Sequence, residues 1–383
     1  MHRTSRRRLA RIAAAVTAAT LLLAGCSKTN ASSDSGSGGG SSAAPIAKDD
    51  LVLVASVINT TNPYMASMIE GAKALSAKLG VPLEVVDSQG SSQTEISKIQ
   101  AILARGKKAV VMVNTVASSD AKPIVDAVKQ AGGYVTIWWN KPDNLEPWDV
   151  GNNFVAFQKY SGVESGECTG KALAESLGGK GNVVGLAGVL DSTTSQTRVA
   201  GFKNALKAYP NIKLLDLQPA NWDPQLGLSV TQNLLTKYPN QIDGIWAADD
   251  AMIIGATQAT KKANVYDKIK YVSDGLYPDV VSLMKQPNSP VVGETFHRGF
   301  MAASIGLYTA YLAATGKIDP STLPHEKRDS LFKLVCATPK DFEQYTKWDN
   351  DVAGWVDTLV NAKDPWSVEP TPLVGQGPEK LPS

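Results

Sequence analysis

Residues 242–256 read Ile242-Asp243-Gly244-Ile245-Trp246-Ala247-Ala248-Asp249-Asp250-Ala251-Met252-Ile253-Ile254-Gly255-Ala256. The short apolar run within them ends at two adjacent carboxylates, and a helix-forming run follows at once. This order is typical of a buried parallel strand that leads directly into a helix. Ligands of open α/β sheets bind outside the carboxyl ends of the strands, so the pattern predicts an α/β fold with a polar site near Asp249 and Asp250.

The two carboxylates can have different roles. An Asp in front of a helix commonly caps it, because its side chain accepts a hydrogen bond from a free backbone N–H. We expect Asp250 to be this cap and Asp249 to contact a ligand.

The composition is that of a globular protein large enough for two lobes. The chain has 383 residues, of which 43% are hydrophobic and 19% are charged. The formal net charge of +2 gives no reason to expect nucleic acid as a partner.

The amino terminus has the features of a secretory signal. Several arginines precede an apolar run, residues 12–24, that is too short to span a bilayer comfortably. The run ends in Leu23-Ala24-Gly25-Cys26, which resembles the lipobox of bacterial lipoproteins. We therefore expect residues 1–25 to be a signal peptide and Cys26 to carry a lipid. An ordinary signal peptide with an incidental Cys is the alternative.

The segment after Cys26 is rich in Ser and Gly. It can bury almost nothing, so we expect residues 26–48 to form a flexible tether to the outer face of the cell membrane. Two cysteines remain, Cys168 and Cys336, an even pair in an oxidising compartment. We expect a disulfide between them, and two buried free thiols are the alternative.

Strand and helix patterns alternate along the chain at a spacing typical of βαβ units and parallel sheets. A polar stretch, residues 140–153, separates two halves of similar architecture, which implies two lobes with a ligand-binding cleft between them. The expected strands are 51–57, 83–86, 109–113, 134–138, 182–187, 212–217, 245–248, 269–273 and 291–294. The expected helices are about 65–79, 94–105, 122–131, 160–177, 198–209, 224–238, 251–263, 278–285, 298–315, 340–347 and 350–360.

Several short phrases follow one another in a characteristic order. They are Asn62-Pro63-Tyr64, Glu70-Gly71-Ala72, Arg198-Val199-Ala200-Gly201-Phe202, Asn221-Trp222-Asp223, Asp249-Asp250 with Gly255-Ala256, and Val272-Ser273-Asp274-Gly275. Together, and behind a lipobox, they resemble periplasmic binding proteins of the ribose-binding type, the solute receptors of sugar ABC importers. The resemblance runs from about Leu51 to Lys317.

The resemblance implies two Rossmann-like lobes with parallel sheets, joined by a hinge of three segments (periplasmic binding protein type I). The first lobe would comprise residues 49–151 and 295–318. The second lobe and hinge return would comprise residues 152–294 and 319–345. The crossings would lie near Gly151, near Glu294 and within residues 318–334. A helix and an irregular extension would form residues 346–383.

The resemblance also implies which first-lobe residues contact a ligand between the lobes. Asn62 would bond a hydroxyl and Tyr64 would stack on a sugar ring, although Asn-Pro is also a common turn pair. The candidates after the third and fourth strands are Asn114, Trp139, Asn140 and Lys141, the last three where ribose binders carry an Asp-Arg pair.

In the second lobe, the guanidinium of Arg198 would donate paired hydrogen bonds to hydroxyls or to a ring oxygen. A structural Arg at a helix start, bonded to a neighbouring carboxylate, is the alternative. Trp222 would form an aromatic wall opposite Tyr64, and Asp274 would accept from two hydroxyls. The remaining contact, near the hinge, would come from Thr295, Phe296 or His297. Asp249 stands where many relatives have Asn, which suggests a shift in specificity.

The function that the resemblance implies is that of a lipid-anchored receptor. It would capture a monosaccharide or polyol and deliver it to the permease subunits of an ABC importer. We expect a monomer that uses no cofactor and no metal. A sugar-sensing receptor for a signalling partner is the alternative. A glycosidase is the weakest interpretation, because Asp249 and Asp250 are adjacent and point differently, although Asp249 and Asp274 could face each other.

Overall fold

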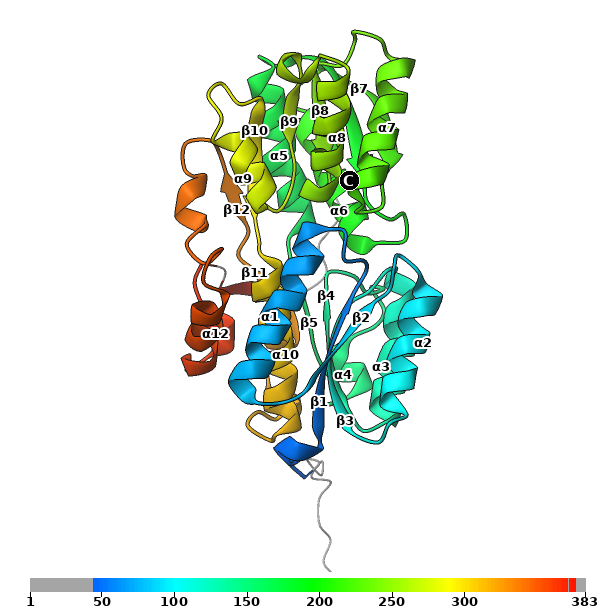
Figure 1. The fold of residues 1–383 in the computed structure, drawn as a ribbon, viewed down its shortest axis with the longest axis vertical. Helices are drawn as coiled ribbons and strands as arrows, with labels where there is room; N and C mark the ends of the chain where they lie inside the picture. Colours follow the sequence, from blue (N-terminus) through cyan, green and yellow to red (C-terminus); the bar gives the residue numbers. More distant parts are fainter. Residues whose placement is uncertain (1–43, 371, 377–383) are drawn as a thin grey trace, which may run out of the picture. The chain divides into compact units, whose positions relative to one another are not determined.

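The computed structural model describes residues 44–370 and 372–376, which form two α/β lobes, each built on its own sheet (Figure 1). The predicted two-lobed α/β fold with largely parallel sheets is confirmed. The predicted signal peptide, the predicted lipidation of Cys26 and most of the predicted tether lie outside the described residues.

The first sheet has the strand order β13-β11-β5-β4-β3-β1-β2. All neighbours pair in parallel except β11 and β13, which are antiparallel. The strands are β1 (Leu51–Val57), β2 (Leu83–Asp87), β3 (Lys108–Asn114), β4 (Tyr134–Trp138), β5 (Phe154–Tyr160), β11 (Asp329–Phe332) and β13 (Leu373–Gln376).

Helices cover both faces of the first sheet because alternate strand residues point to opposite faces. Leu51 and Leu53 of β1 join a core with residues of the helices that contain Met68 and Met301. Val52 and Val54 join a second core on the other face. The helices are α1 (Pro63–Leu79), α2 (Ser92–Leu103), α3 (Ala121–Gln130), α4 (Pro147–Val150), α10 (Gly299–Ala314), α11 (His325–Arg328) and α12 (Val352–Asn361).

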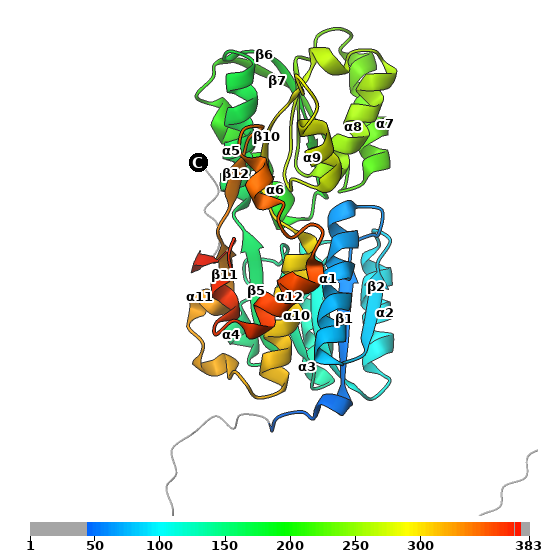
Figure 2. The ribbon, with the colours of Figure 1, turned by 60° about the vertical axis from the view of Figure 1, so that its left-hand side comes forward.

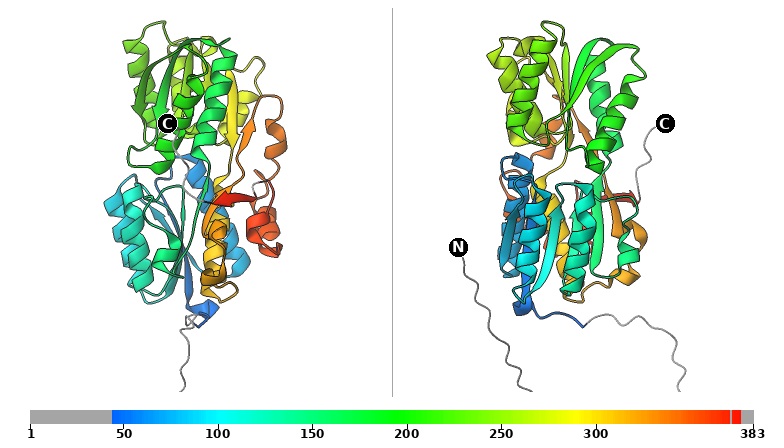
Figure 3. Two further views of the ribbon diagram at one scale, coloured as in Figure 1. Left: turned by 180° about the vertical axis from the view of Figure 1, so that it is seen from behind. Right: turned by 90° about the vertical axis from the view of Figure 1, so that its right-hand side faces the viewer.

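The second sheet has the strand order β12-β10-β9-β8-β6-β7, and only β12 is antiparallel to its neighbour. Helices again lie on both of its faces (Figure 3). The strands are β6 (Lys180–Ala187), β7 (Asn211–Pro219), β8 (Gly244–Ala247), β9 (Lys270–Val272), β10 (Val291–Phe296) and β12 (Val335–Ala337). The helices are α5 (Gly162–Ser176), α6 (Thr193–Leu206), α7 (Pro224–Lys237), α8 (Asp250–Lys262) and α9 (Pro278–Met284).

The first two crossings between the lobes lie later in the chain than expected, whereas the third lies within the expected residues 318–334. The chain first leaves the first sheet after β5, a strand absent from the sequence prediction, and not near Gly151. It returns after β10, at residues 297–298, and crosses again between β11 and β12. A fourth crossing follows, because α12 packs against α1 and α10 of the first lobe (Figure 2). The added hinge segment is residues 338–351.

The carboxyl-terminal region is more ordered than expected. The helix predicted at 340–347 is a short 3-10 turn, Phe342–Tyr345, and the extension expected to be irregular contains β13. Trp355 of α12 is fully buried and donates its indole N–H to Ser304 Oγ of α10 at 2.8 Å. These contacts attach α12 to the first lobe.

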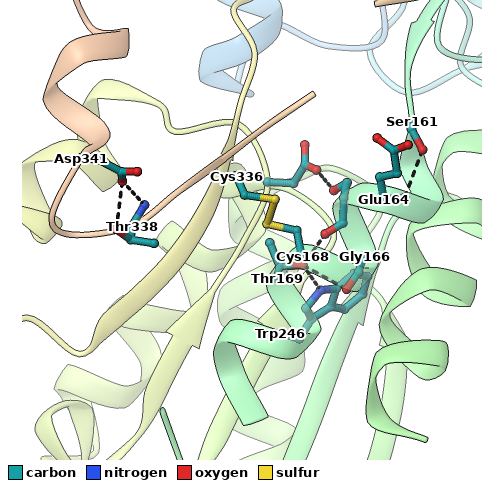
Figure 4. The surroundings of a disulfide bond; sticks show 11 residues. Ser161, Glu164, Gly166, Cys168, Thr169, Trp246, Cys336, Thr338 and Asp341 are labelled. Atoms are coloured by element: carbon teal, nitrogen blue, oxygen red, sulfur yellow. Dashed lines mark hydrogen bonds between the residues drawn. A yellow bond between two sulfur atoms is a disulfide. The ribbon is translucent and has the colours of Figure 1, made fainter. Parts of the chain in front are cut away.

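A disulfide joins Cys168 of α5 to Cys336 of β12, with 6.2 Å between the Cα atoms (Figure 4). Cys336 lies on the strand that pairs with β10. The bond therefore attaches the third hinge segment to a helix of the second lobe.

Candidate functional site

A small cavity lies between the lobes, next to the carboxyl ends of several strands. Its volume is about 30 Å³, room for about two waters and too little for a sugar ring. In this arrangement of the lobes the cavity therefore has no room for a sugar ring. The lining residues are Ile58, Tyr64, Met65, Asn114, Trp139, Asn140, Thr194, Arg198, Trp222, Asp249, Tyr277 and His297.

Most of the predicted contact residues line this cavity, but three do not. Asn62 is buried beside it, and Asp274 lies behind Arg198 and His297. Lys141 lines a neighbouring cavity. The lining residues that the sequence prediction missed are Ile58, Met65, Thr194 and Tyr277. Of these only Tyr277 had a usable signal, an aromatic residue in the loop after a strand.

Aromatic rings from both lobes meet in the cavity. Trp139 Nε1 donates to the hydroxyl of Tyr64 at 3.0 Å, within the first lobe. Across the cleft Tyr277 stacks on Tyr64, with ring centroids 5.8 Å apart and an interplanar angle of 21°. Trp139 and Trp222 both have positive φ, 74° and 63°, a strained conformation for bulky side chains that often occurs at binding sites.

Arg198 has two roles in the site. Its guanidinium carbon lies 4.8 Å from the Trp139 ring and 5.9 Å from the Trp222 ring, close enough for cation–π attraction. Nη1 donates to the carbonyl oxygen of Ala248 at 2.6 Å, and Nη2 pairs with Asp274 at 2.8 Å. The structural role considered for this Arg is thus present, and the residue also lines the cavity.

Asp274 and His297 form a buried charge network with Arg198. Burial alone would raise the pKa of Asp274, but Arg198 and His297 outweigh it and hold the pKa below its ordinary value. Burial lowers the pKa of His297, against the opposing charge of Asp274. A neutral His297 donates from Nε2 to the carboxylate of Asp274, which leaves Nδ1 as an acceptor beside the cavity.

Asp249, not Asp250, caps α8. Its backbone is extended, with φ −157° and ψ 166°, and Oδ1 accepts from the N–H of Met252 at 3.1 Å. Oδ2 accepts from Nδ2 of Asn62 at 2.7 Å, across the cleft. Burial raises the pKa of Asp249 to about 7. The expected division between one cap and one ligand contact is therefore wrong, because Asp249 has the cap geometry and also lines the cavity.

Asp250 is fully buried behind the cavity. It accepts from Ser273 Oγ at 2.6 Å and from the backbone N–H of Tyr277 at 2.5 Å. Burial and the charge of Asp250 raise the pKa of Glu294 well above its ordinary value, and Glu294 accepts from Ser273 Oγ in the same network. Asp250 thus holds the loop that carries Tyr277 into the site.

Four lining side chains each keep one buried polar atom without a hydrogen-bond partner within the described residues. The atoms are Asn114 Oδ1, Arg198 Nε, Trp222 Nε1 and His297 Nδ1. Two are donors, and two can accept in the His tautomer assigned above. Buried polar atoms are normally bonded, so this set favours a ligand that both donates and accepts, as hydroxyl groups do.

Two α/β lobes with a polar and aromatic cavity between them define a two-lobed solute-binding protein. Residues 53–318 match the family model described as periplasmic binding protein domain, and the chain belongs to this family. Its relatives include proteins named for binding sugars or a sugar alcohol, some of them as import binding proteins. The ribose import binding protein RbsB of Escherichia coli (strain K12) is 32% identical over 231 residues, which cover 60% of this chain and 74% of that protein.

Two further similarities extend over more of the chain. The xylitol-binding protein of Mycolicibacterium smegmatis is 26% identical over 277 residues, 72% of this chain and 76% of that protein. The crystal structure of a twin-arginine translocation pathway signal protein from Burkholderia phytofirmans is 32% identical, with a TM-score of 0.77. That similarity covers 86% of this chain and 99% of the other.

Proposed function

We propose that this protein binds a neutral monosaccharide or sugar alcohol between its lobes and delivers it to the permease of an ABC importer. The set of unpartnered donors and acceptors around the cavity carries this proposal. The aromatic rings beside them suit the C–H faces of a sugar. The ribose and xylitol relatives support the same ligand class.

We infer ligand capture without chemistry, because the carboxylates of the site are already engaged. Asp249 caps a helix and binds Asn62, and Asp274 binds Arg198 and His297. Neither has a free carboxylate facing the other, as glycoside hydrolysis would require.

The proposed location is the outer face of the cell membrane, with Cys26 as the lipid anchor and the protein as a monomer. The lipobox and the Ser- and Gly-rich segment behind it support this location. Among the residues that the structure describes, no helix is both long and apolar enough to cross a membrane. Labelling cells with a radioactive fatty acid tests the anchor: wild type should incorporate label and Cys26→Ser should not.

A thermal-shift screen of the protein against pentoses, hexoses, sugar alcohols and inositols tests the ligand class. A ligand at a hundred times its dissociation constant adds about 2.7 kcal/mol to the stability of the protein that binds it. We expect at least one of these compounds to raise the melting temperature. The absence of a shift with every polyol would contradict the ligand class and leave the fold unaffected.

The site itself is tested by Trp222→Ala. Trp222 is buried and lines the cavity, so its removal should weaken binding of the compound found in the screen by about 2 kcal/mol, roughly 30-fold. Trp148→Ala is a matched control, because Trp148 lies outside the cavity and stacks on His325. Equal affinity in the two variants would show that Trp222 is not part of the binding site.

A further inference from the structure

A second cavity adjoins the one between the lobes. Trp139 and Thr194 line both cavities, and Thr194 Oγ1 donates to the carbonyl oxygen of Trp139 at 2.8 Å. This pair, one residue from each lobe, is part of the lining of both spaces. We call the second space the flanking cavity. Its volume is about 40 Å³, room for about three water-sized groups.

The flanking cavity contains buried charges of both signs. Lys141 and Lys159 are 5% and 9% exposed, and their ammonium groups lie 5.0 Å and 5.6 Å from the ring centre of Phe157. Asp329, on β11, is 1% exposed, and its Oδ1 has no hydrogen-bond partner within the described residues. Burying an unbonded carboxylate oxygen is costly, so its presence here points to a missing donor.

The chemistry of the lining distinguishes between ligand groups. A carboxylate or phosphate has no donor for Asp329 Oδ1 and would repel it when Asp329 is ionised. An ammonium group would be repelled by the ammonium groups of Lys141 and Lys159. A hydroxyl group can donate to Asp329 Oδ1, and its oxygen can accept a further hydrogen bond from a donor of the lining.

We propose that the flanking cavity is a subsite that receives a hydroxylated arm of the ligand held in the main cavity. The inference depends on the proposed function and narrows it. Sugars that carry an exocyclic CH₂OH group should bind better than their counterparts that lack it. Trp139 lines both cavities and would contact both the ring and the arm.

Matched sugar pairs test the subsite, because each hexose adds a CH₂OH group to a pentose of the same ring stereochemistry. The pairs are D-ribose with D-allose, D-xylose with D-glucose and L-arabinose with D-galactose. For the pair that binds best, isothermal titration calorimetry of the wild type should show the hexose bound about tenfold more tightly. Equal affinities, or a tighter pentose, would overturn the inference.

Variants locate the preference in the flanking cavity. Asp329→Ala removes the acceptor and should reduce the hexose-to-pentose affinity ratio to about one, whereas Asp329→Asn keeps an acceptor and should preserve part of it. If Asp329→Ala does not fold, Lys159→Met removes a donor, keeps the aliphatic stem over Phe157, and should reduce the same ratio. An unchanged ratio in the folded variants would overturn the inference.

Two further outcomes separate the inference from the proposed function. If D-glucuronate binds more tightly than D-glucose, the subsite is for an anion and the inference is wrong. If no sugar binds the wild type, the proposed function fails and the subsite fails with it. Binding of both members of every pair with equal affinity contradicts the subsite alone.

Discussion

At the scale of the residue, the Asn62–Asp249 pair explains why residue 249 is Asp. Asn62 caps α1, because its Oδ1 accepts from the N–H of Tyr64 at 2.9 Å. Its amide nitrogen is therefore directed across the cleft, where it needs acceptors. Asp249 Oδ2 and the carbonyl oxygen of Trp222 supply them, at 2.7 Å and 3.0 Å. An Asn at 249 that kept its cap would present a second amide nitrogen instead.

We predict that Asp249→Asn weakens ligand binding about tenfold, because opposed amide donors disfavour the closed arrangement of the lobes. Calorimetry with the compound found in the screen measures the change. Asp351→Asn is the matched control, since Asp351 also caps a helix, α12, but lies outside the cavity. Equal affinity in the two variants would show that the Asn62–Asp249 pair has no influence on binding.

Glu95 is a buried carboxyl whose environment predicts a pH dependence of stability. It accepts from Ser56 Oγ and from the N–H of Val116, yet burial raises its pKa from 4.5 to about 7. Between these values the folded protein holds a proton that the unfolded chain releases. The stability that Glu95 contributes is therefore greatest below pH 4.5 and is lost as the pH rises towards 7.

Glu95→Gln should remove this dependence, because its amide group can donate to Ser56 and Ser88 while its oxygen accepts from Val116. Relative to the variant, wild type should lose about 3 kcal/mol at most between pH 4.5 and pH 7.5. Urea unfolding of both proteins across this range measures the difference. A constant difference at all pH values would contradict the raised pKa.

At the scale of the element, glycines on facing helices explain several phrases that identified the family. A Cβ on Gly71 of α1 would overlap the backbone of Phe300 in α10, and a Cβ on Gly299 of α10 would overlap the backbone of Tyr64 in α1. The same holds for Gly166 of α5 with Gly201 of α6, and for Gly227 of α7 with Gly255 of α8. The glycines in these phrases are therefore explained by close helix packing. Arg198 lies one turn before Gly201 on α6, so the packing of α6 also positions Arg198.

We predict that Gly201→Ala destabilises the protein by about 1–3 kcal/mol, although Ala is normally the better helix former. The added methyl group would overlap the carbonyl oxygen of Val163 and push α6 away from α5. Lys203→Ala, on the exposed face of the same helix, is the control and should be close to neutral. The free energy of unfolding measures both, and a stabilised Gly201→Ala would contradict this packing.

At the scale of the whole molecule, the carboxyl-terminal part of the chain adds constraints to the hinge. Residues 338–351 run back from the second lobe to the first. Near the end of this segment Asp349 forms a bidentate ion pair with Arg298, in which Nε donates to Oδ1 at 2.6 Å and Nη2 donates to Oδ2 at 2.9 Å. The Cys168–Cys336 disulfide attaches β12, which directly precedes this segment, to α5. Both ends of the added segment are therefore attached, one to each lobe.

We predict that replacing both cysteines by Ser lowers the free energy of unfolding by about 2–5 kcal/mol, because the disulfide closes a long loop, with a sequence separation of 168. Cys336 is exposed, so a reductant should destabilise the wild type similarly and leave the double variant unchanged. Urea unfolding with and without reductant measures both effects. Equal stability of wild type and variant in oxidising buffer would contradict this role.

The sequence by itself determined the two-lobed α/β architecture and most side chains of the cavity. Strand patterns and helix patterns alternate along the chain and predict β1 to β4 and β6 to β10. A buried strand needs a run of apolar residues, and the helix that covers it needs an apolar face. The ends of β3 and β8 then bring Asn114 and Asp249 to the cleft, and the first turns of α6 bring Arg198 there.

Only the tertiary structure decided the features that depend on pairing between distant segments. β5, β11 and β13 are strands because neighbouring strands bond them, and runs this short or mixed have no clear period of their own. The fourth crossing depends on where α12 finds an apolar partner surface. The bond between Asp249 and Asn62 joins residues that are 187 positions apart along the chain. Contacts of such long range have no local pattern in sequence.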